Sequence, residues 1–196
     1  MPTGRPREFD LEKALDQALN VFWRKGFEGA SLPDLTKAMG INRPSLYAAF
    51  GNKEELFRRA MERYLEGPAC HTREALAEPT ARAVAERWLR GTIELLTRPR
   101  HPRGCFMVQG ALACGQAGDA VRREMARHRA NGEAALRERF ERAQSEGDLP
   151  RECNAADLAR YVAAVNFGLS VQAAGGAKRA ELESVVDMAL RAWPGA

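Results

Sequence analysis

The side chains that could carry out chemistry are scattered along this chain of 196 residues. Its three histidines, His71, His101 and His128, lie in separate segments, and its four cysteines form neither a C-x-x-C pair nor a zinc-ligand spacing. His101 and Cys105 are four residues apart, as in a Cys–His nucleophile pair or half of a metal site, but both alternatives lack the third group that such sites need. No Ser-His-Asp order and no glycine-rich phosphate loop is present. We therefore expect no enzyme activity, no metal site and no cofactor.

Cys105 could instead be a reactive thiol. It begins a nearly apolar segment, RGCFMVQGALACG (residues 103–115), and would lie at the positive end of a helix. That position, together with the nearby Arg103 and His101, predicts a lowered thiol pKa. The alternative is an inert cysteine that packs like a small apolar residue.

The bulk composition is that of a globular protein, with 45% hydrophobic and 29% charged residues. The first residues lack the apolar stretch of a secretory signal, and no apolar run approaches the ~18 residues that a membrane span requires. We therefore expect a cytoplasmic protein with no membrane partner. The net charge of +4 permits a polyanionic partner. However, residues 1–66 hold 11 of the 30 basic and 10 of the 26 acidic residues, so bulk charge does not locate such a site.

Nearly every segment is predicted to be helical, which indicates an all-α protein. Asp10, Ser31, Asn42 and Asn52 can each cap a helix N-terminus. Helices are expected near residues 11–25, 31–40, 43–49, 52–66, 69–77, 80–97, 104–114, 119–146, 155–174 and 180–193. Because the helices lengthen after Gly67-Pro68, we predict a small domain over residues 1–66 and a larger one over residues 67–196.

The most informative stretch is SLPDLTKAMGINRPSLYAAFGNKEELF, from Ser31 to Phe57. Two short helices joined through Gly40, which tolerates a left-handed backbone, are what a helix-turn-helix requires. Leu35, Ala38 and Met39 are expected to face inward from the first of these helices. Leu46 and Phe50 are expected to face inward from the second and to pack on Phe22 and Phe27. The outward residues, which include Arg43, Pro44, Ser45, Tyr47 and Ala48, could enter a major groove about 12 Å wide. The alternative is a helical corner with ordinary surface residues.

Each exposed residue of this stretch suggests a specific contact with DNA. Arg43 can donate two hydrogen bonds to a guanine, and Tyr47 can meet a thymine methyl group or a phosphate. Lys53 begins the next helix, where its charge and the free backbone amides can hold a phosphate. The preceding arm contains Arg5 and Arg7, which could enter a narrow minor groove. The alternative for this arm is a solvated terminus.

Residues 9–66 resemble the N-terminal domain of the tetracycline-repressor (TetR) family. The similarity rests on "F..KGF.G.S", on "L..AMGI" and on "RPSLYAAFGNKEELF". It implies a homodimer with two recognition helices in successive major grooves, with Arg43, Pro44 and Tyr47 facing bases and Ser31, Ser45 and Lys53 facing phosphates. The chain departs from the family at Ala48 and Ala49, where many members have larger aromatic or histidine residues, so one backbone contact fewer is expected.

The similarity also implies a variable C-terminal domain that binds an effector and forms the dimer. The last two predicted helices carry apolar faces that could pair across a two-fold axis into a four-helix bundle. These dimer candidates are Leu158, Val162, Val165, Leu169, Leu182, Val185, Val186 and Ala189. The alternative is that these faces pack only within the monomer.

A cavity for a small, largely apolar organic molecule is predicted in the same domain. Gln109 suggests it, because a polar side chain in an apolar segment either bonds to nearby backbone or lines a cavity. The candidate wall is made of Trp88, Cys105, Phe106, Gln109, Leu112, Tyr161 and Asn166, each of which is also typical of plain core. "RGC" before an apolar helix resembles a TetR subgroup in which the matching cysteine senses electrophiles or oxidants.

The sequence thus favours a dimeric repressor that binds a palindromic, double-stranded DNA operator and is released by a small-molecule effector or a thiol-reactive species. The alternatives are an activator or dual regulator with the same DNA contacts, and a small-molecule binding module without DNA function. In the favoured mechanism the recognition helices lie ~35 Å apart when competent for DNA. An effector that binds more tightly to a conformation with a different spacing shifts the population of dimers toward that conformation. The shift is expected to move the fourth helix, residues 53–66, and to pull the recognition helices apart.

Overall fold

The computed structural model describes residues 9–99, 101–112 and 118–194, and its side chains except those of residues 110–112. Arg5, Arg7 and Cys114 lie outside the described residues. Within those ranges the assigned secondary structure is helical, which confirms the all-α prediction. The helices are α1 (Leu11–Gly29), α2 (Leu32–Met39), α3 (Arg43–Phe50), α4 (Lys53–Glu66), α5 (His71–Ala75), α6 (Ala81–Leu96), α7 (Phe106–Leu112), α8 (Asp119–Ser145), α9 (Ala155–Ala174) and α10 (Arg179–Arg191). None of these described helices is long and apolar enough to span a membrane.

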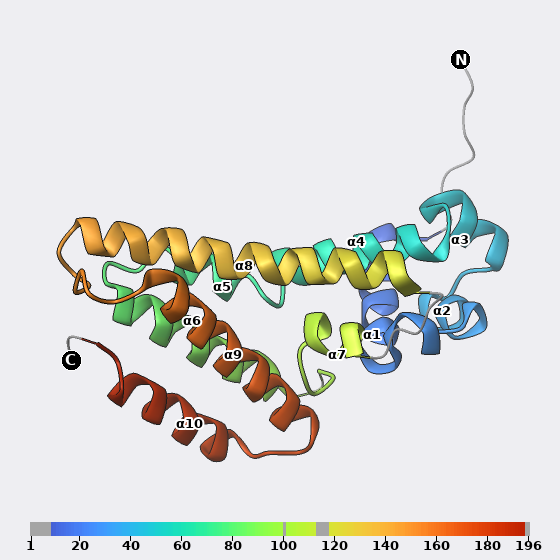
Figure 1. Cartoon of the computed structure of the whole chain (residues 1–196). Helices are drawn as coiled ribbons and strands as arrows, with labels where there is room; N and C mark the ends of the chain where they lie inside the picture. Colours follow the sequence, from blue (N-terminus) through green and yellow to red (C-terminus); the bar gives the residue numbers. More distant parts are fainter. Residues whose placement is uncertain (1–8, 100, 113–117, 195–196) are drawn as a thin grey trace.

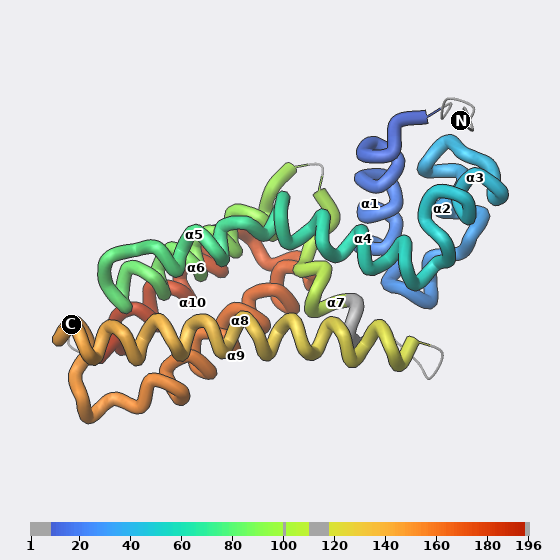
Figure 2. Tube along the Cα trace, turned by 90° about the horizontal axis from the view of Figure 1, so that it is seen from above, coloured from blue at the N-terminus to red at the C-terminus, as the bar shows by residue number. Residues whose placement is uncertain are grey.

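The helices form an elongated molecule with two ends (Figure 1). Helices α1 to α3 gather at one end with the beginning of α4, whereas α5, α6, α9 and α10 lie toward the other end. Helix α8 runs along most of the molecule, α4 runs from the first end toward the middle, and α7 lies near the middle (Figure 2). The two ends are therefore joined by a continuous helix, α8.

The predicted helix starts are confirmed by side-chain caps, which satisfy backbone amides that have no partner inside the helix. Asp10 Oδ1 accepts from the backbone amide of Glu12 at 3.0 Å. Asn42 Oδ1 accepts from Ser45 at 2.8 Å, and Asn52 Oδ1 accepts from Glu55 at 2.8 Å. Ser31 and Asp34 cap one another's amides at the start of α2. These four caps fix where the helices of the first end begin.

Two glycines set the breaks between elements. Gly40 ends α2 with φ 67°, the left-handed conformation that the turn before α3 was predicted to need. Gly104 has φ 86°, so α7 begins after it, at Phe106, rather than at the predicted residue 104. An added Cβ at Gly104 would lie 2.0 Å from Gln109 Nε2 and 3.1 Å from the Cβ of Ala174, which leaves no room for a side chain.

One hydrophobic core lies beneath the first four helices and continues into α7 and the start of α8. Phe22 of α1 and Phe57 of α4 meet edge to face, with their ring centroids 5.0 Å apart. Phe57 also stacks on Phe106 of α7 at 5.1 Å. The indole of Trp23 donates to the carbonyl oxygen of Gly104 at 2.7 Å. The first end of the molecule is therefore packed directly against the segment around α7.

A second core lies between α6, α8, α9 and α10, and it corrects the predicted dimer interface. Five of the eight predicted interface residues are buried inside the single chain: Val162, Leu169, Leu182, Val186 and Ala189. Leu158, Val165 and Val185 are partly buried against the same core. The apolar periodicity was real, but it marks the inner faces of α9 and α10. The alternative of packing within the monomer is therefore correct for the five buried residues.

Candidate nucleic-acid interface and effector cavity

Helix α3 presents two distinct faces. Leu46 and Phe50 are buried in the first core, as predicted. Arg43, Pro44, Tyr47 and Ala48 are exposed, and Ser45 is partly buried. The ring of Tyr47 is 40% exposed, which is unusual for so large an apolar group. An outward face of this kind is available to a partner of the protein.

Arg43 and Tyr47 lie together on this outward face. The guanidinium of Arg43 donates to the hydroxyl of Tyr47 at 3.4 Å, and its central carbon lies 5.7 Å from the centroid of the ring. The two residues are one helical turn apart, so a surface that contacts one also contacts the other. Together they form a planar, hydrogen-bonding and partly apolar patch that suits the edge of a base pair.

Two of the three predicted phosphate contacts, Ser31 and Lys53, are engaged by neighbouring groups in this structure. The hydroxyl of Ser31 donates to Asp34 Oδ2 at 2.7 Å. Hydrogen bonds from Lys25 and then from Ser31 lower the pKa of Asp34 to about 2. The ammonium of Lys53 lies 4.6 Å from the ring centroid of Phe27, and its burial lowers its pKa. Lys53 must therefore swing away from Phe27 to reach a phosphate.

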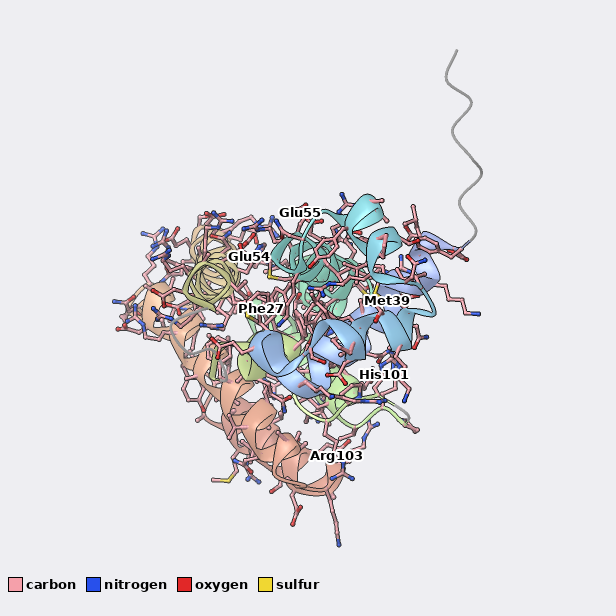
Figure 3. All side chains as sticks on the ribbon, turned by 90° about the vertical axis from the view of Figure 1, so that its right-hand side faces the viewer. Phe27, Met39, Glu54, Glu55, His101 and Arg103 are labelled. Carbon is pink, nitrogen blue, oxygen red and sulfur yellow. The ribbon has the colours of Figure 1, made fainter. Side chains whose placement is uncertain are left out.

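Figure 3 looks at the molecule from the end formed by the first helices. Glu54 and Glu55, on the first turn of α4, lie toward the top of this view, and Phe27 lies inward of them. His101 and Arg103 lie below, on the segment that precedes α7.

A cavity of about 140 Å³ lies between α4, α6, α8 and α9. Three of the predicted wall residues line it, namely Trp88, Cys105 and Asn166. Much of the remaining wall comes from residues that the sequence did not single out, among them Tyr64, His71, Thr92, Met107, Arg129 and Glu133. No local pattern marked these residues, because they come from different helices that only the tertiary fold brings together.

Three other predicted wall residues lie elsewhere. Phe106 is buried in the first core, with its ring centroid 5.3 Å from that of Tyr64. Gln109 Nε2 donates to the carbonyl oxygen of Arg103 at 3.0 Å, which is the backbone alternative considered for it. Tyr161 is 42% exposed on α9. None of these three residues lines this cavity, and the side chain of Leu112 lies outside the described part of the chain.

A hydrogen-bonded cluster forms one part of the cavity wall. The Thr92 hydroxyl lies 2.6 Å from Asn166 Oδ1, 3.0 Å from the carbonyl oxygen of Trp88 and 3.1 Å from His71 Nε2. Burial lowers the pKa of His71 to about 4, so its imidazole is neutral at pH 7. The cluster thus joins α5, α6 and α9 through neutral groups.

Cys105 lies where the cavity meets the first core. Its sulfur is 3.3 Å from the hydroxyl of Tyr64. Burial raises the pKa of the Cys105 thiol, and this effect exceeds the opposite influence of Tyr64, the backbone and Arg129. The predicted lowering of this pKa is therefore wrong. Desolvation dominates, and Arg103, which was expected to help, is exposed to solvent.

The cavity is connected to the first helix through aromatic contacts. Tyr64, in the cavity wall, meets Trp23 of α1 edge to face, with ring centroids 4.9 Å apart. Trp23 in turn holds Gly104, the residue before Cys105. In addition, Arg58 of α4 donates to Glu124 of α8 at 2.9 Å. A molecule in the cavity would therefore touch groups that are packed on α1 and α4.

Two family models match the chain. Residues 14–60 match "Bacterial regulatory proteins, tetR family", and residues 77–189 match "Tetracyclin repressor-like, C-terminal domain". In the described part of the chain, no group of three or more His, Cys, Asp or Glu side chains is placed to hold a metal.

Similar proteins cover almost the whole chain. The HTH-type transcriptional repressor ComR of Escherichia coli (strain K12) is 33% identical over 97% of this chain and 92% of that protein. The uncharacterised HTH-type regulator YezE of Bacillus subtilis (strain 168) is 32% identical over 95% of this chain and 97% of that protein. A cysteine mutant of the TetR-family regulator CifR, solved with operator DNA, is 45% identical over 97% of this chain and all of that chain, with a TM-score of 0.93.

These proteins are transcriptional regulators, which agrees with the expectation that the chain is not an enzyme. The family matches cover both the helix-turn-helix and the helical domain that contains the cavity. The chain belongs to the TetR family of bacterial regulatory proteins.

Proposed function

We propose that this protein is a ligand-responsive transcriptional repressor that binds a palindromic DNA operator in the cytoplasm as a homodimer. The observation that carries the proposal is the exposed pair of Arg43 and Tyr47 on a short helix whose other face is buried. ComR is described as a repressor, and the CifR mutant is described as complexed with a 26-bp operator, which supports a DNA-binding repressor role here.

In the proposed complex, α3 lies in the major groove with its N-terminal residues toward the bases. Arg43 donates to a guanine, Tyr47 contacts a thymine methyl group, and Pro44 packs beside them. Ser31, Ser45 and Lys53 contact phosphates, which position the helix without reading sequence. Arg5 and Arg7 extend the contact into the adjacent minor groove.

We propose that the effector binds the cavity beside Tyr64 and Cys105. If the bound effector moves the side chain of Tyr64, the packing between α4 and α1 also changes, because Tyr64 belongs to α4 and contacts Trp23 of α1. The spacing of the two recognition helices then shifts away from the one that fits DNA. A thiol-reactive species would act at the same place by modifying Cys105.

The test is the double variant Arg43→Ala with Tyr47→Ala. Because each bidentate Arg–guanine contact contributes ~1–3 kcal/mol and a dimer makes two, specific binding should weaken by at least about 30-fold. Fluorescence anisotropy with a duplex from the adjacent promoter and with a scrambled duplex measures this change. Arg151→Ala removes an equally exposed arginine far from α3 and serves as the control.

Unchanged operator affinity in the double variant, with the same melting temperature and oligomeric state, would reject α3 as the reading element. An activator or dual regulator would use the same contacts, so a separate readout is needed. A reporter downstream of the operator, with and without the gene, distinguishes them. Higher expression without the gene supports repression, and lower expression supports activation.

A further inference from the structure

Arg129 of α8 lines the cavity and has no charged partner among the residues that the structure describes. Its Nη1 donates to the carbonyl oxygen of Met107 at 2.7 Å, which is its one hydrogen bond to a described residue. A guanidinium carries five N–H donors, so most of its hydrogen-bonding capacity is unused. Among the described residues, no carboxylate lies within 4.0 Å of it.

Glu133, the acidic residue among the described wall residues, is already paired elsewhere. Glu133, one turn along α8 from Arg129, lies 3.4 Å from the Nε of Arg160 on α9. His71, on another part of the wall, is neutral at pH 7. Much of the remaining wall is apolar, with Leu95, Leu96, Met107 and Leu136 among its residues. The cavity therefore contains a positive charge that its described wall does not neutralise.

Two further hydrogen-bond donors in the cavity wall also have no partner among the described residues. Asn166 Oδ1 is used by Thr92, while its amide nitrogen has no hydrogen bond to a described residue. Trp88, which also lines the cavity, is buried, and its indole N–H has no partner among the described residues. Buried polar groups normally have partners, because an unpaired one costs free energy. The described wall thus offers N–H donors without partners and a positive charge, which an acceptor on a ligand could satisfy.

We propose that the effector is a small monocarboxylate with an apolar body, whose carboxylate pairs with Arg129 and whose second oxygen accepts from Asn166. The cavity volume of about 140 Å³ fits a body the size of a benzene ring, since an apolar cavity of about 150 Å³ binds benzene. A single guanidinium balances one negative charge, whereas a phosphate would bring nearly two. This inference rests on the proposed function, because it names the ligand class for the proposed effector site.

Calorimetry on the full-length protein tests the ligand class without DNA. The ligands are benzoate and cyclohexanecarboxylate, with benzamide and benzyl alcohol as neutral molecules of similar size. We expect at least one of the acids to bind at least about 10-fold more tightly than the neutral molecules, because charge-assisted hydrogen bonds are roughly twice as strong as neutral ones. Equal binding of acids and neutral molecules, or no binding of either acid, overturns the inference.

Variants then assign the contact. Arg129→Met should remove the preference for acids, and Arg129→Lys should retain part of it, because the positive charge stays but the fork geometry is lost. Arg127→Met is the matched control, since Arg127 lies on the same helix and is exposed. An acid preference that persists in Arg129→Met overturns the assignment. If Arg129→Met does not fold, the ligand comparison on the unaltered protein still decides the ligand class.

A second measurement separates this inference from the proposed function. Operator release by each acid is followed by anisotropy under the same conditions. An acid that binds through Arg129 and leaves the operator complex intact supports the ligand class and contradicts the effector role. Release by a neutral compound, with no binding of the acids, supports the effector role and contradicts the ligand class.

Discussion

Tyr64 and Cys105 are the residues through which the cavity and the DNA-binding helices touch. The thiol and the phenol are 3.3 Å apart, and burial raises the pKa of both groups. Because the thiolate is the reacting form of cysteine, a raised pKa makes Cys105 a slow nucleophile at neutral pH. Its position in the wall nevertheless means that an adduct would occupy the cavity and displace Tyr64.

Modification of Cys105 is therefore expected to be slow, and effective once it has occurred. At pH 7, N-ethylmaleimide should react with Cys105 at least about 10-fold more slowly than with free glutathione, and the rate should rise with pH as the thiolate forms. Mass spectrometry after timed quenching follows the adduct, and anisotropy follows the operator complex. Release should track the adduct in the unaltered protein and be absent in Cys105→Ser. Equal release from both proteins would remove Cys105 from the mechanism.

The neutral state of His71 predicts a pH dependence of stability. Burial lowers its pKa from 6.5 to about 4, so the folded protein binds fewer protons than the unfolded chain between these values. The unfolding free energy should therefore fall as the pH drops from about 6.5 to about 4. The maximum loss is ~3 kcal/mol, at 1.36 kcal/mol for each unit of pKa. Urea unfolding across this range, followed by circular dichroism, measures the change.

The matched variant is His71→Gln, which keeps a donor for Thr92 and does not titrate. Its unfolding free energy should depend less on pH than that of the unaltered protein between pH 4 and 6.5, with the curves diverging toward lower pH. Two parallel curves would show that His71 does not carry the dependence.

Among the helices, the features that depend on neighbours in sequence were predictable. Asp10, Ser31, Asn42 and Asn52 cap helices as expected, because a cap involves only residues two or three positions away. The buried face of α3 was predictable for the same reason. The elements that pack on α9 could not be predicted in this way. An apolar stripe shows which face of a helix is buried, but it does not show whether that face packs within the subunit or on a second subunit. Val162 therefore belongs to the core of the subunit, although its periodicity equally suited a dimer.

The residues that line the cavity were harder still to predict from the sequence. Trp88 and Asn166, which the sequence suggested as wall residues, line this cavity. Arg129 lines it too but was not suggested, because nothing in its local sequence separates it from the other arginines of α8. Gln109 was a plausible wall residue, and its amide bonds to Arg103 instead because Gly104 turns the chain back toward it. Non-local contacts decide such cases.

The turn before α7 predicts a measurable difference between two glycines. Gly104 and Gly147 both have positive φ, at 86° and 81°, so an alanine at either position is strained by ~1–2 kcal/mol. An added Cβ meets nothing within 4 Å at Gly147, whereas at Gly104 it collides with Gln109 and presses on Ala174. Gly104→Ala should additionally break the Gln109–Arg103 hydrogen bond, which adds ~1 kcal/mol. Thermal unfolding should therefore show a clearly lower melting temperature for Gly104→Ala than for Gly147→Ala, and equal values would contradict this account.

At the scale of the whole molecule, the two halves share contacts rather than a flexible linker. The first core includes Phe106 and Met125, which come from α7 and α8, and Arg58 of α4 pairs with Glu124 of α8. A shift around α7 therefore cannot leave α4 unchanged. Helix α4 contacts α3 in turn, because the guanidinium of Arg59 lies 5.7 Å from the ring centroid of Phe50 and donates to the carbonyl oxygen of Ala49 at 3.5 Å. Packing provides a continuous route from the cavity to the recognition helix.

The outer faces of α9 and α10 are where we expect the second subunit. Tyr161 and Val171 of α9 and Met188 of α10 are 42%, 52% and 62% exposed, and large apolar groups at such exposure are candidates for a partner contact. Tyr161, Ala164, Gly168 and Val171 follow one another at helical spacing, and nothing lies within 4 Å of a Cβ added at Gly168. This face has room for close approach of another helix, and it is distinct from the buried stripe that the sequence suggested.

The double variant Val171→Asp with Met188→Asp should be monomeric, because two carboxylates on each subunit would be desolvated at the interface without partners. Since the two α3 helices of a dimer bind half-sites on one duplex, loss of the dimer should weaken operator binding by on the order of 100-fold or more, while ligand binding in the cavity is retained. Sedimentation velocity gives the oligomeric state, and anisotropy gives the affinity. Ala126→Asp, on the exposed side of α8, adds a carboxylate elsewhere and should change neither. A double variant that remains dimeric would show that the second subunit binds another face. A monomeric variant with full operator affinity would show that operator binding does not require the dimer.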